Sequence, residues 1–199
     1  MTMLIRHYIL QKHYKAILVV VMVTFFFASC EPEIIPERHF VIRKGNHYAT
    51  PRLNETLQSS TLVFDARFNE SAVYDLGDPT LQNNKNKLLG FSDCNALHHE
   101  NSARFAWQWF NGHLEIYAYC YIDGERKEAY MGTVSLDCYN RYEIEVTSSD
   151  YVFILNGGPP LSFQRKNVCD NGLYYRLWPY FGGSVAAPHD VFINIRMNY

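Results

Sequence analysis

The sequence predicts an all-β fold, a two-sheet antiparallel β-sandwich, from three observations. Asn111-Gly112 and Asp123-Gly124 are strong hairpin signals, because both central residues of a type I′ turn need positive φ. Apolar and polar residues alternate around these turns and in several other segments. No segment after residue 30 holds a convincing helical period. Short strands separated by turns every ten or so residues are typical of a sandwich.

The two turns fix the register of three central strands. With two-residue loops, Phe110 faces His113 and Ile122 faces Glu125, and a slip of one residue would exchange the two faces. The predicted core face carries Phe105, Trp107, Trp109, Leu114, Ile116, Ala118, Cys120, Ile122, Ala129, Met131 and Thr133. The predicted opposite face carries Arg104, Gln108, Phe110, His113, Glu115, Tyr117, Tyr119, Tyr121, Arg126, Glu128 and Tyr130.

Alternation predicts further strands on both sides of this meander. A polar stretch at residues 75–87 is expected to be a long loop. The additional strands are expected at residues 61–68, 141–146, 151–155, 172–178 and 191–197.

From about residue 100 onward the chain shows a characteristic order of features: Phe105-Ala106-Trp107-Gln108-Trp109, the two hairpins, residues 151–157, and a closing strand after Ala187-Pro188-His189-Asp190. This order resembles the concanavalin A-like lectin and glucanase sandwiches, including laminin G-like domains. The resemblance covers about half of the chain and implies a jelly-roll fold with a tendency toward carbohydrate ligands. Fold alone does not establish function.

The N-terminus predicts export. Residues 1–15 carry Arg6, Lys12 and Lys15 without an acidic residue, and residues 16–28 are apolar apart from Thr24. This segment is shorter than the roughly 20 apolar residues of a transmembrane helix. The alternatives are an uncleaved anchor or a secretory peptide with a chance cysteine.

The end of this segment resembles a bacterial lipoprotein signal, because Cys30 follows the small residues Ala28 and Ser29. Phe27 departs from that pattern, where Leu is usual. The resemblance implies that Cys30 is acylated, with palmitate among its acyl chains. Since Glu31 rather than Asp follows it, an outer-membrane lipoprotein is expected, on either the periplasmic or the exposed side.

Three parts of the chain follow: a signal peptide at 1–29, a lipidated tether at 30–38, and a sandwich domain at 39–199. The whole chain has 18 basic and 20 acidic residues, and the signal holds three of the basic ones, so the mature chain has 15 against 20, a formal net charge of −5. With no basic stripe either, nucleic acid is not an expected partner.

Four cysteines remain after cleavage, and an oxidising compartment permits disulfides. Cys94, Cys138 and Cys169 sit among polar turn residues, whereas Cys120 lies within an apolar strand pattern. One disulfide among the three turn cysteines is expected, with two disulfides as the alternative. No cofactor or metal site is expected. Oxygen ligands of the kind that calcium prefers do gather at Asp75, Asp78, Asn83 and Asn84. A zinc site is not expected, because no standard ligand spacing is matched by Cys94, His98, His99 and Glu100.

The opposite face of the meander is unusually aromatic for a solvated surface, and it mixes rings with planar polar groups. Sugars stack on rings while such polar groups bind hydroxyls, so this face is the candidate glycan site. A structural aromatic face is the alternative, since cross-strand tyrosine pairs stabilise a sheet without a ligand. The residues at 178–183 are a weaker candidate for a binding rim. The candidate site residues are Arg104, Gln108, Glu115, Tyr117, Tyr119, Glu128 and Tyr130.

Catalysis is a secondary expectation. Glycoside hydrolysis needs two carboxyl groups at a fixed separation. The predicted register sets Glu115 opposite Gly132 and Glu128 opposite Tyr119, so these two carboxyl groups are too far apart. The pair Glu143 and Glu145 is a weak alternative. A lyase would use residues of the types of Arg104, Gln108, His113 and Tyr117. The expected function is therefore non-catalytic binding of a glycan or an envelope partner, with a polysaccharide-degrading enzyme, or an adhesin or structural subunit, as alternatives.

Overall fold

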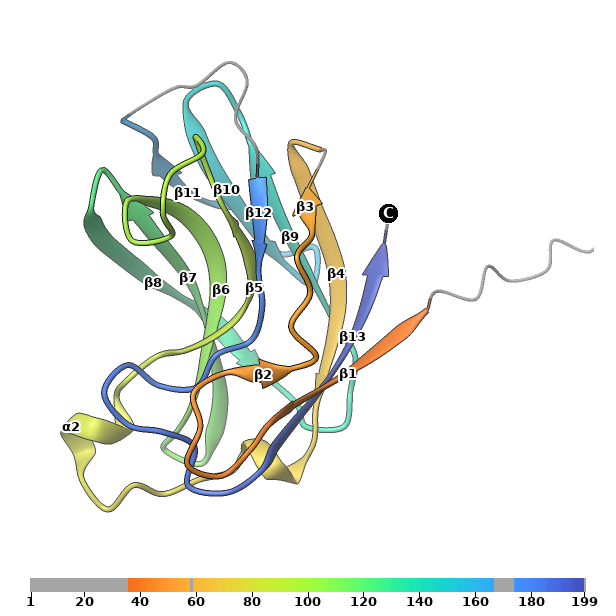
Figure 1. Cartoon of the computed structure of the whole chain (residues 1–199), viewed down its shortest axis with the longest axis vertical. Helices are drawn as coiled ribbons and strands as arrows, with labels where there is room; N and C mark the ends of the chain where they lie inside the picture. The colour runs from red at the N-terminus through yellow and green to blue at the C-terminus, as the bar shows by residue number, and fades with distance from the viewer. Residues whose placement is uncertain (1–35, 58, 167–173, 199) are drawn as a thin grey trace, which may run out of the picture. The chain divides into compact units, whose positions relative to one another are not determined.

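Two antiparallel sheets pack face to face in this computed structural model, which describes residues 36–57, 59–166 and 174–198 (Figure 1). The predicted all-β sandwich is confirmed, and its architecture is that of the concanavalin A-like jelly rolls. The predicted signal peptide and Cys30 lie outside the described residues. Within the described ranges, no helix has the length and apolar character needed to cross a membrane.

The first sheet has seven strands in the order β11-β10-β9-β4-β13-β1-β2, and the second has six in the order β3-β12-β5-β6-β7-β8. The strands of the first sheet are β1 (Glu37–Ile42), β2 (Ala49–Thr50), β4 (Thr61–Phe68), β9 (Asn140–Val146), β10 (Asp150–Leu155), β11 (Leu161–Gln164) and β13 (Val191–Asn198). The strands of the second sheet are β3 (Thr56–Leu57), β5 (Asn86–Ser92), β6 (Asn101–Phe110), β7 (His113–Ile122), β8 (Glu125–Val134) and β12 (Tyr174–Leu177).

Both hairpin turns of the meander form as predicted. Asn111 and Gly112 have φ of 49° and 78°, and Asp123 and Gly124 have φ of 54° and 77°, which is the left-handed geometry of a type I′ turn. The predicted register is therefore confirmed across most of β6, β7 and β8. The confirmed pairs include Phe110 with His113, Ile122 with Glu125, Gln108 with Glu115, and Tyr117 with Tyr130.

The far end of β8 departs from the predicted register. A β-bulge lies between the pair Tyr117–Tyr130 and the pair Ile116–Gly132, so that Glu115 pairs with Thr133 and not with Gly132. The prediction that Thr133 faces the core was wrong, because the extra residue turns it to the exposed face. Val134 takes the buried position instead.

The core between the sheets is strongly aromatic. The ring of Trp107 is fully buried and lies 5.0 Å from Phe68 and 6.0 Å from both Tyr74 and Phe181, measured between ring centroids. The contacts with Tyr74 and Phe181 are edge-to-face, and such contacts add to the stabilisation that comes from burying the rings. The assignment of Trp107 to the core side of the meander is therefore confirmed.

The stretch expected to be a long loop contains two short elements that periodicity did not reveal. Asp78 caps the single helical turn α2 (Pro79–Gln82), since its Oδ1 accepts a 2.7 Å hydrogen bond from the Thr80 amide. A 3₁₀ turn, η1 (Glu70–Ala72), precedes it. Strand β5 then begins at Asn86 and is buried along most of its length, so its sequence shows no alternation.

The cysteines agree with a single disulfide. Cys94 is disulfide-bonded, and its partner lies outside the described residues. Cys120 is a buried free thiol and Cys138 an exposed one. With these two of the chain's five cysteines free, a second disulfide does not form.

Candidate functional site

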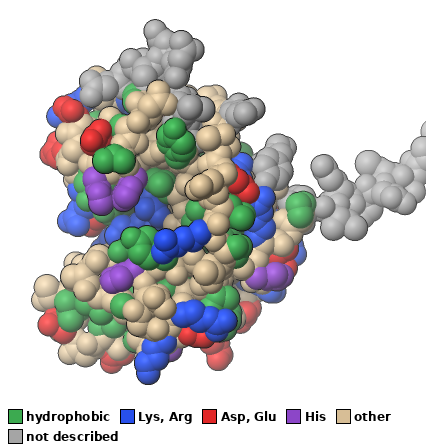
Figure 2. Space-filling model, viewed as in Figure 1, with side chains coloured by type: hydrophobic (Ala, Val, Ile, Leu, Met, Phe, Trp, Pro, Cys, Tyr) green, Lys and Arg blue, Asp and Glu red, His purple; other side chains and the backbone are tan. Residues whose placement is uncertain are grey.

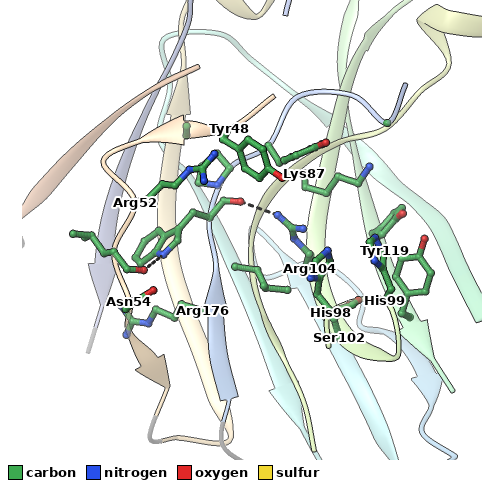
Figure 3. A pocket seen from close by; sticks show the side chains of 18 of the residues that line it. Tyr48, Arg52, Asn54, Lys87, His98, His99, Ser102, Arg104, Tyr119 and Arg176 are labelled. Atoms are coloured by element: carbon green, nitrogen blue, oxygen red, sulfur yellow. Dashed lines mark hydrogen bonds between the residues drawn. The ribbon is translucent and has the colours of Figure 1, made fainter. Parts of the chain in front are cut away.

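A cleft of about 650 Å³ opens on the outer face of the six-stranded sheet, where basic side chains gather at its base (Figure 2). Its floor comes from outward-facing side chains of strands β5, β6 and β7. One wall is formed by residues 48–54 and 176–180, and the other by the loop that carries His98 and His99 (Figure 3). We call this hollow the cationic cleft.

Arg104 lies at the centre of the floor and is only 8% exposed. Its Nη2 donates a 2.7 Å hydrogen bond to the carbonyl of Trp178, while its buried Nε has no hydrogen-bond partner. Gly90 on β5 makes room for it, since a Cβ there would lie 2.6 Å from Arg104 Cγ. Burial lowers the pKa of Arg104 to about 10. A buried cation without a counter-ion is costly, and no carboxylate of the described residues pairs with this one.

Lys87 on β5 brings a second, half-buried cation to the cleft. Its Nζ donates to the carbonyls of Lys85 at 2.8 Å and Gly182 at 3.1 Å, and it lies 5.1 Å from the ring centroid of Tyr119. Burial lowers its pKa to about 8, and repulsion from Arg104 acts in the same direction. The ammonium is therefore mostly charged at neutral pH and loses its proton as the pH rises through about 8.

Three more basic residues line the cleft, and no aspartate or glutamate does so among the described residues. Arg176 is neutralised by Glu55, whose Oε2 accepts a 2.8 Å hydrogen bond from Arg176 Nη1. Arg126 has only a distant carboxylate neighbour, Glu128, at 3.9 Å. Arg52 has no carboxylate partner in the described part of the chain. The cleft therefore has a net positive charge.

The two walls are rich in aromatic rings. On one side Tyr180 packs edge-to-face on Tyr48 with 4.9 Å between centroids and stacks on His47 at 5.2 Å. On the other side the rings of His98 and His99 lie 4.0 Å apart. Rings around a few polar groups are typical of small-molecule and sugar sites.

Two ionisable groups beside Arg104 are held in their neutral forms. Partial burial lowers the pKa of His98, with further repulsion from His99 and Arg104. Burial raises the pKa of Tyr119, and its hydrogen bond with Tyr121 raises it further. His98 is therefore neutral and Tyr119 protonated at neutral pH, which makes the first a potential proton acceptor and the second a potential donor.

The predicted site residues divide into two groups. Arg104 and Tyr119 line the cationic cleft, and the other five lie on the same sheet face but outside the cleft. Those five are Gln108, Glu115, Tyr117, Glu128 and Tyr130.

Several cleft residues were missed by the sequence analysis. Lys87 falls in the stretch 75–87, which was expected to be a loop. No sequence pattern pointed to Tyr48 or Arg52 as site residues. Of the segment 178–183, which was the weaker candidate for a binding rim, Tyr180 lines the cleft whereas Phe181 is buried in the core.

The carboxyl pairs weighed for glycoside hydrolysis lie elsewhere. Glu143 and Glu145 are on β9 of the other sheet, and Glu143 Oε1 accepts a 3.0 Å hydrogen bond from Arg141. Glu115 and Glu128 occupy separate cross-strand rows.

The lyase set is also divided. His113 is exposed at the β6–β7 turn, far along the strand from Arg104.

Neither of the two metal-ligand clusters considered forms a site. The Oδ1 atoms of Asp75 and Asp78 accept backbone hydrogen bonds within their own turns. Cys94 is engaged in its disulfide. Among the described residues, no three His, Cys, Asp or Glu side chains come together in a way that could hold a metal ion.

No protein-family model and no curated protein sequence matches this chain. Solved structures do. An alginate lyase from Klebsiella pneumoniae superposes with a TM-score of 0.54 at 12% identity, covering 69% of this chain and 58% of the lyase. The alginate lyase AlyC3 in complex with dimannuronate superposes with a TM-score of 0.55 at 10% identity, covering 80% of this chain and 72% of that one. At these identities the likeness shows the fold alone.

Proposed function

We propose that this protein binds an acidic polysaccharide in the cationic cleft and is held at the cell envelope by a lipid anchor. The observation that carries the proposal is the buried guanidinium of Arg104, which has no carboxylate partner among the described residues. A carboxylate on the ligand would supply the missing counter-ion, and arginine recognises carboxylates with two parallel hydrogen bonds.

The rest of the cleft supports the same ligand class. Lys87 and Arg126 extend the positive charge, while Tyr48 and Tyr180 offer rings on which a sugar can stack. The volume of about 650 Å³ lies within the range of ligand sites, which is roughly 300 to 1,000 Å³. Two fold neighbours are alginate lyases, and one is in complex with dimannuronate, so uronate polymers are the first ligands to test.

Calorimetric titration of the domain with mannuronan, galacturonan and a neutral β-glucan tests the proposal. A uronate polymer should bind with an affinity that falls as salt is added, and the neutral glucan should not bind. Arg104→Met should weaken this binding strongly. Equal binding of the neutral glucan, or full affinity in the Arg104 variant, would overturn the assignment.

Cleavage by β-elimination is the second candidate, favoured by neutral His98 and protonated Tyr119 beside Arg104. In such a reaction the base takes the proton α to the carboxylate, the C4–O bond breaks, a C4–C5 double bond forms, and an acid protonates the leaving oxygen. Arg104 would neutralise the carboxylate. Ultraviolet absorbance from unsaturated uronates would establish this activity, whereas binding without absorbance favours the non-catalytic function.

The anchor part of the proposal rests on Cys30 and the segment before it, which lie outside the described residues. Lipoprotein acylation would attach more than one chain, and two membrane signals are enough for stable attachment. Metabolic labelling with a radioactive fatty acid should mark the wild type and not Cys30→Ala, and the wild type should fractionate with outer membranes. Label that persists in the variant would refute acylation at this residue.

A further inference from the structure

We infer that a second subsite adjoins the cationic cleft and accepts a sugar residue without an acid group. The inference rests on the proposed function, because it describes the neighbouring residue of the same polysaccharide. The subsite consists of Gln108, Glu115, Tyr117 and Tyr130, which we call the tyrosine platform. It makes the proposed ligand more specific: a polysaccharide that contains both acidic and uncharged sugar residues, in place of a polymer of uronates alone.

The register places the platform in line with the cleft. Side chains two residues apart on a strand share a face, so Arg104 and Gln108 both point outward from β6. Tyr119 beside Arg104 belongs to the cleft, and Glu115 beside Gln108 belongs to the platform. The two rows are four residues apart, or roughly 13 Å at the usual rise of a strand. A ligand of a few sugar rings would reach both.

The platform holds a prearranged set of polar groups. Glu115 Oε2 accepts hydrogen bonds from Gln108 Nε2 at 2.6 Å and from the Tyr117 hydroxyl at 2.7 Å. Burial and the contact with Glu115 raise the pKa of Tyr117, so the hydroxyl keeps its proton. Glu115 Oε1 makes no hydrogen bond within the described part of the chain and is open to a ligand hydroxyl.

A second observation also points to a missing hydrogen-bond donor. Gln108 is 1% exposed, and its Oε1 is a buried acceptor without a partner among the described residues. Such atoms are uncommon in folded proteins because leaving them unpaired is costly. This oxygen is shielded from solvent, so a sugar hydroxyl would reach it only with a shift of the Gln108 side chain.

Tyr130 provides the stacking surface. Its side chain is 53% exposed, and Tyr117 holds it edge-to-face with 5.6 Å between the ring centroids. An exposed ring fixed in orientation loses little further freedom when a ligand stacks on it.

The charge of the platform opposes an acidic sugar. Glu115 forms no ion pair within the described residues, whereas the neighbouring Glu128 lies 3.9 Å from both Lys85 Nζ and Arg126 Nε. Lys85 Nζ lies 3.9 Å from Glu128 Oε1, donates to Asn83 Oδ1 at 2.9 Å, and sits 4.3 Å from the ring centroid of Tyr117. A uronate placed here would face like charge, whereas the cleft attracts it.

Matched ligands test this inference. Mannuronan and galacturonan are each prepared fully acidic and with half of their carboxyl groups reduced to alcohols, which leaves linkage and stereochemistry unchanged. The comparison is made for whichever of the two polymers binds. We expect its half-reduced form to bind about tenfold more tightly than its acidic form, in spite of the lower charge. A cleft acting by charge alone would bind the acidic form more tightly, and that result would overturn the inference.

Variants separate the subsite from the cleft. Glu115→Gln keeps an acceptor for Tyr117 but removes the charge, and it should bring the acidic and half-reduced forms to equal affinity. Glu145→Gln removes the same charge from the exposed face of the other sheet and should leave the preference intact. Tyr130→Ala should weaken the half-reduced form more than the acidic form. If the wild type prefers the acidic form and Glu115→Gln leaves that preference unchanged, the subsite is refuted while the proposed function stands. If neither form binds, the subsite and the proposed function are both refuted.

Discussion

Arg104 Nη2 donates a 2.7 Å hydrogen bond to the carbonyl oxygen of Trp178, and this contact joins the middle of β6 to the segment that follows β12. One guanidinium therefore both forms the floor of the cleft and fixes the wall beside it. It does so without a carboxylate partner in the described residues, so the charge remains available to a ligand.

Replacing Arg104 separates binding from folding. Arg104→Met should weaken binding of an acidic polymer ~100-fold, because the ligand's carboxylate would lose its buried partner. Stability should stay the same or rise, since an apolar side chain removes the desolvation cost of a buried cation. Parallel calorimetry and denaturant melts measure both effects. Arg141→Met, at an exposed position on β9, is the control; a large loss of stability without loss of binding would contradict the role given to Arg104.

Packing on the two faces of the meander gives a stability prediction. Trp107→Ala should cost about 3 to 5 kcal/mol, as expected when a large aromatic side chain is removed from a core. Tyr117→Ala should cost less, because its ring lies on the outer face and is half-buried. Urea melts of both variants make the comparison, and a costlier Tyr117 variant would be inconsistent with the observed register.

This register could be predicted from sequence because it depends on local signals. Two turns that need positive φ set the pairing of three strands, and alternation then assigned Trp107 to the core and Tyr117 to the outer face. The bulge near Gly132 carried no comparable signal, so the prediction for Thr133 failed.

The cleft was only half predictable for a different reason. Its floor residues Arg104 and Tyr119 belong to the registered strands, whereas Tyr48, His98 and Tyr180 come from segments far apart in sequence. The pairing of β12 with β5 and the bridges of Tyr180 to Tyr48 and Lys87 help to bring these segments together, and neither is encoded in a local pattern.

Asp93 and Arg165 form a buried ion pair next to the disulfide-bonded Cys94, and this predicts strong energetic coupling between the two side chains. Asp93, which is fully buried, accepts 2.6 Å hydrogen bonds at Oδ2 from Arg165 Nη2 and from the Tyr151 hydroxyl. Asp93→Asn should destabilise the domain by about 3 to 5 kcal/mol, because it leaves the Arg165 charge without its partner. Asp137→Asn, in an exposed turn, should change little.

The double variant tests this coupling directly. Adding Arg165→Met to Asp93→Asn should recover part of the loss, since the uncompensated charge is then gone. Denaturant melts of the two single variants and the double variant form a complete cycle, and strictly additive losses would show that the two groups are not coupled.

Lys87 predicts a pH dependence of both stability and binding. Its pKa is about 8 in the folded protein against the ordinary lysine value of 10.5, so the unfolded chain binds more protons between these two pH values. The free energy of unfolding should therefore rise with pH across that window, and the rise should be smaller in Lys87→Met.

The affinity for an acidic polymer should change with pH in the opposite direction to the stability. A bound carboxylate favours the charged ammonium and raises the pKa of Lys87, so a proton is taken up on binding and affinity should fall as pH rises through about 8. Calorimetry in buffers of different ionisation enthalpy measures the proton uptake directly. Lys87→Met should bind more weakly at neutral pH and show no such uptake near pH 8. Uptake that persists in the variant would place the titrating group elsewhere in the cleft.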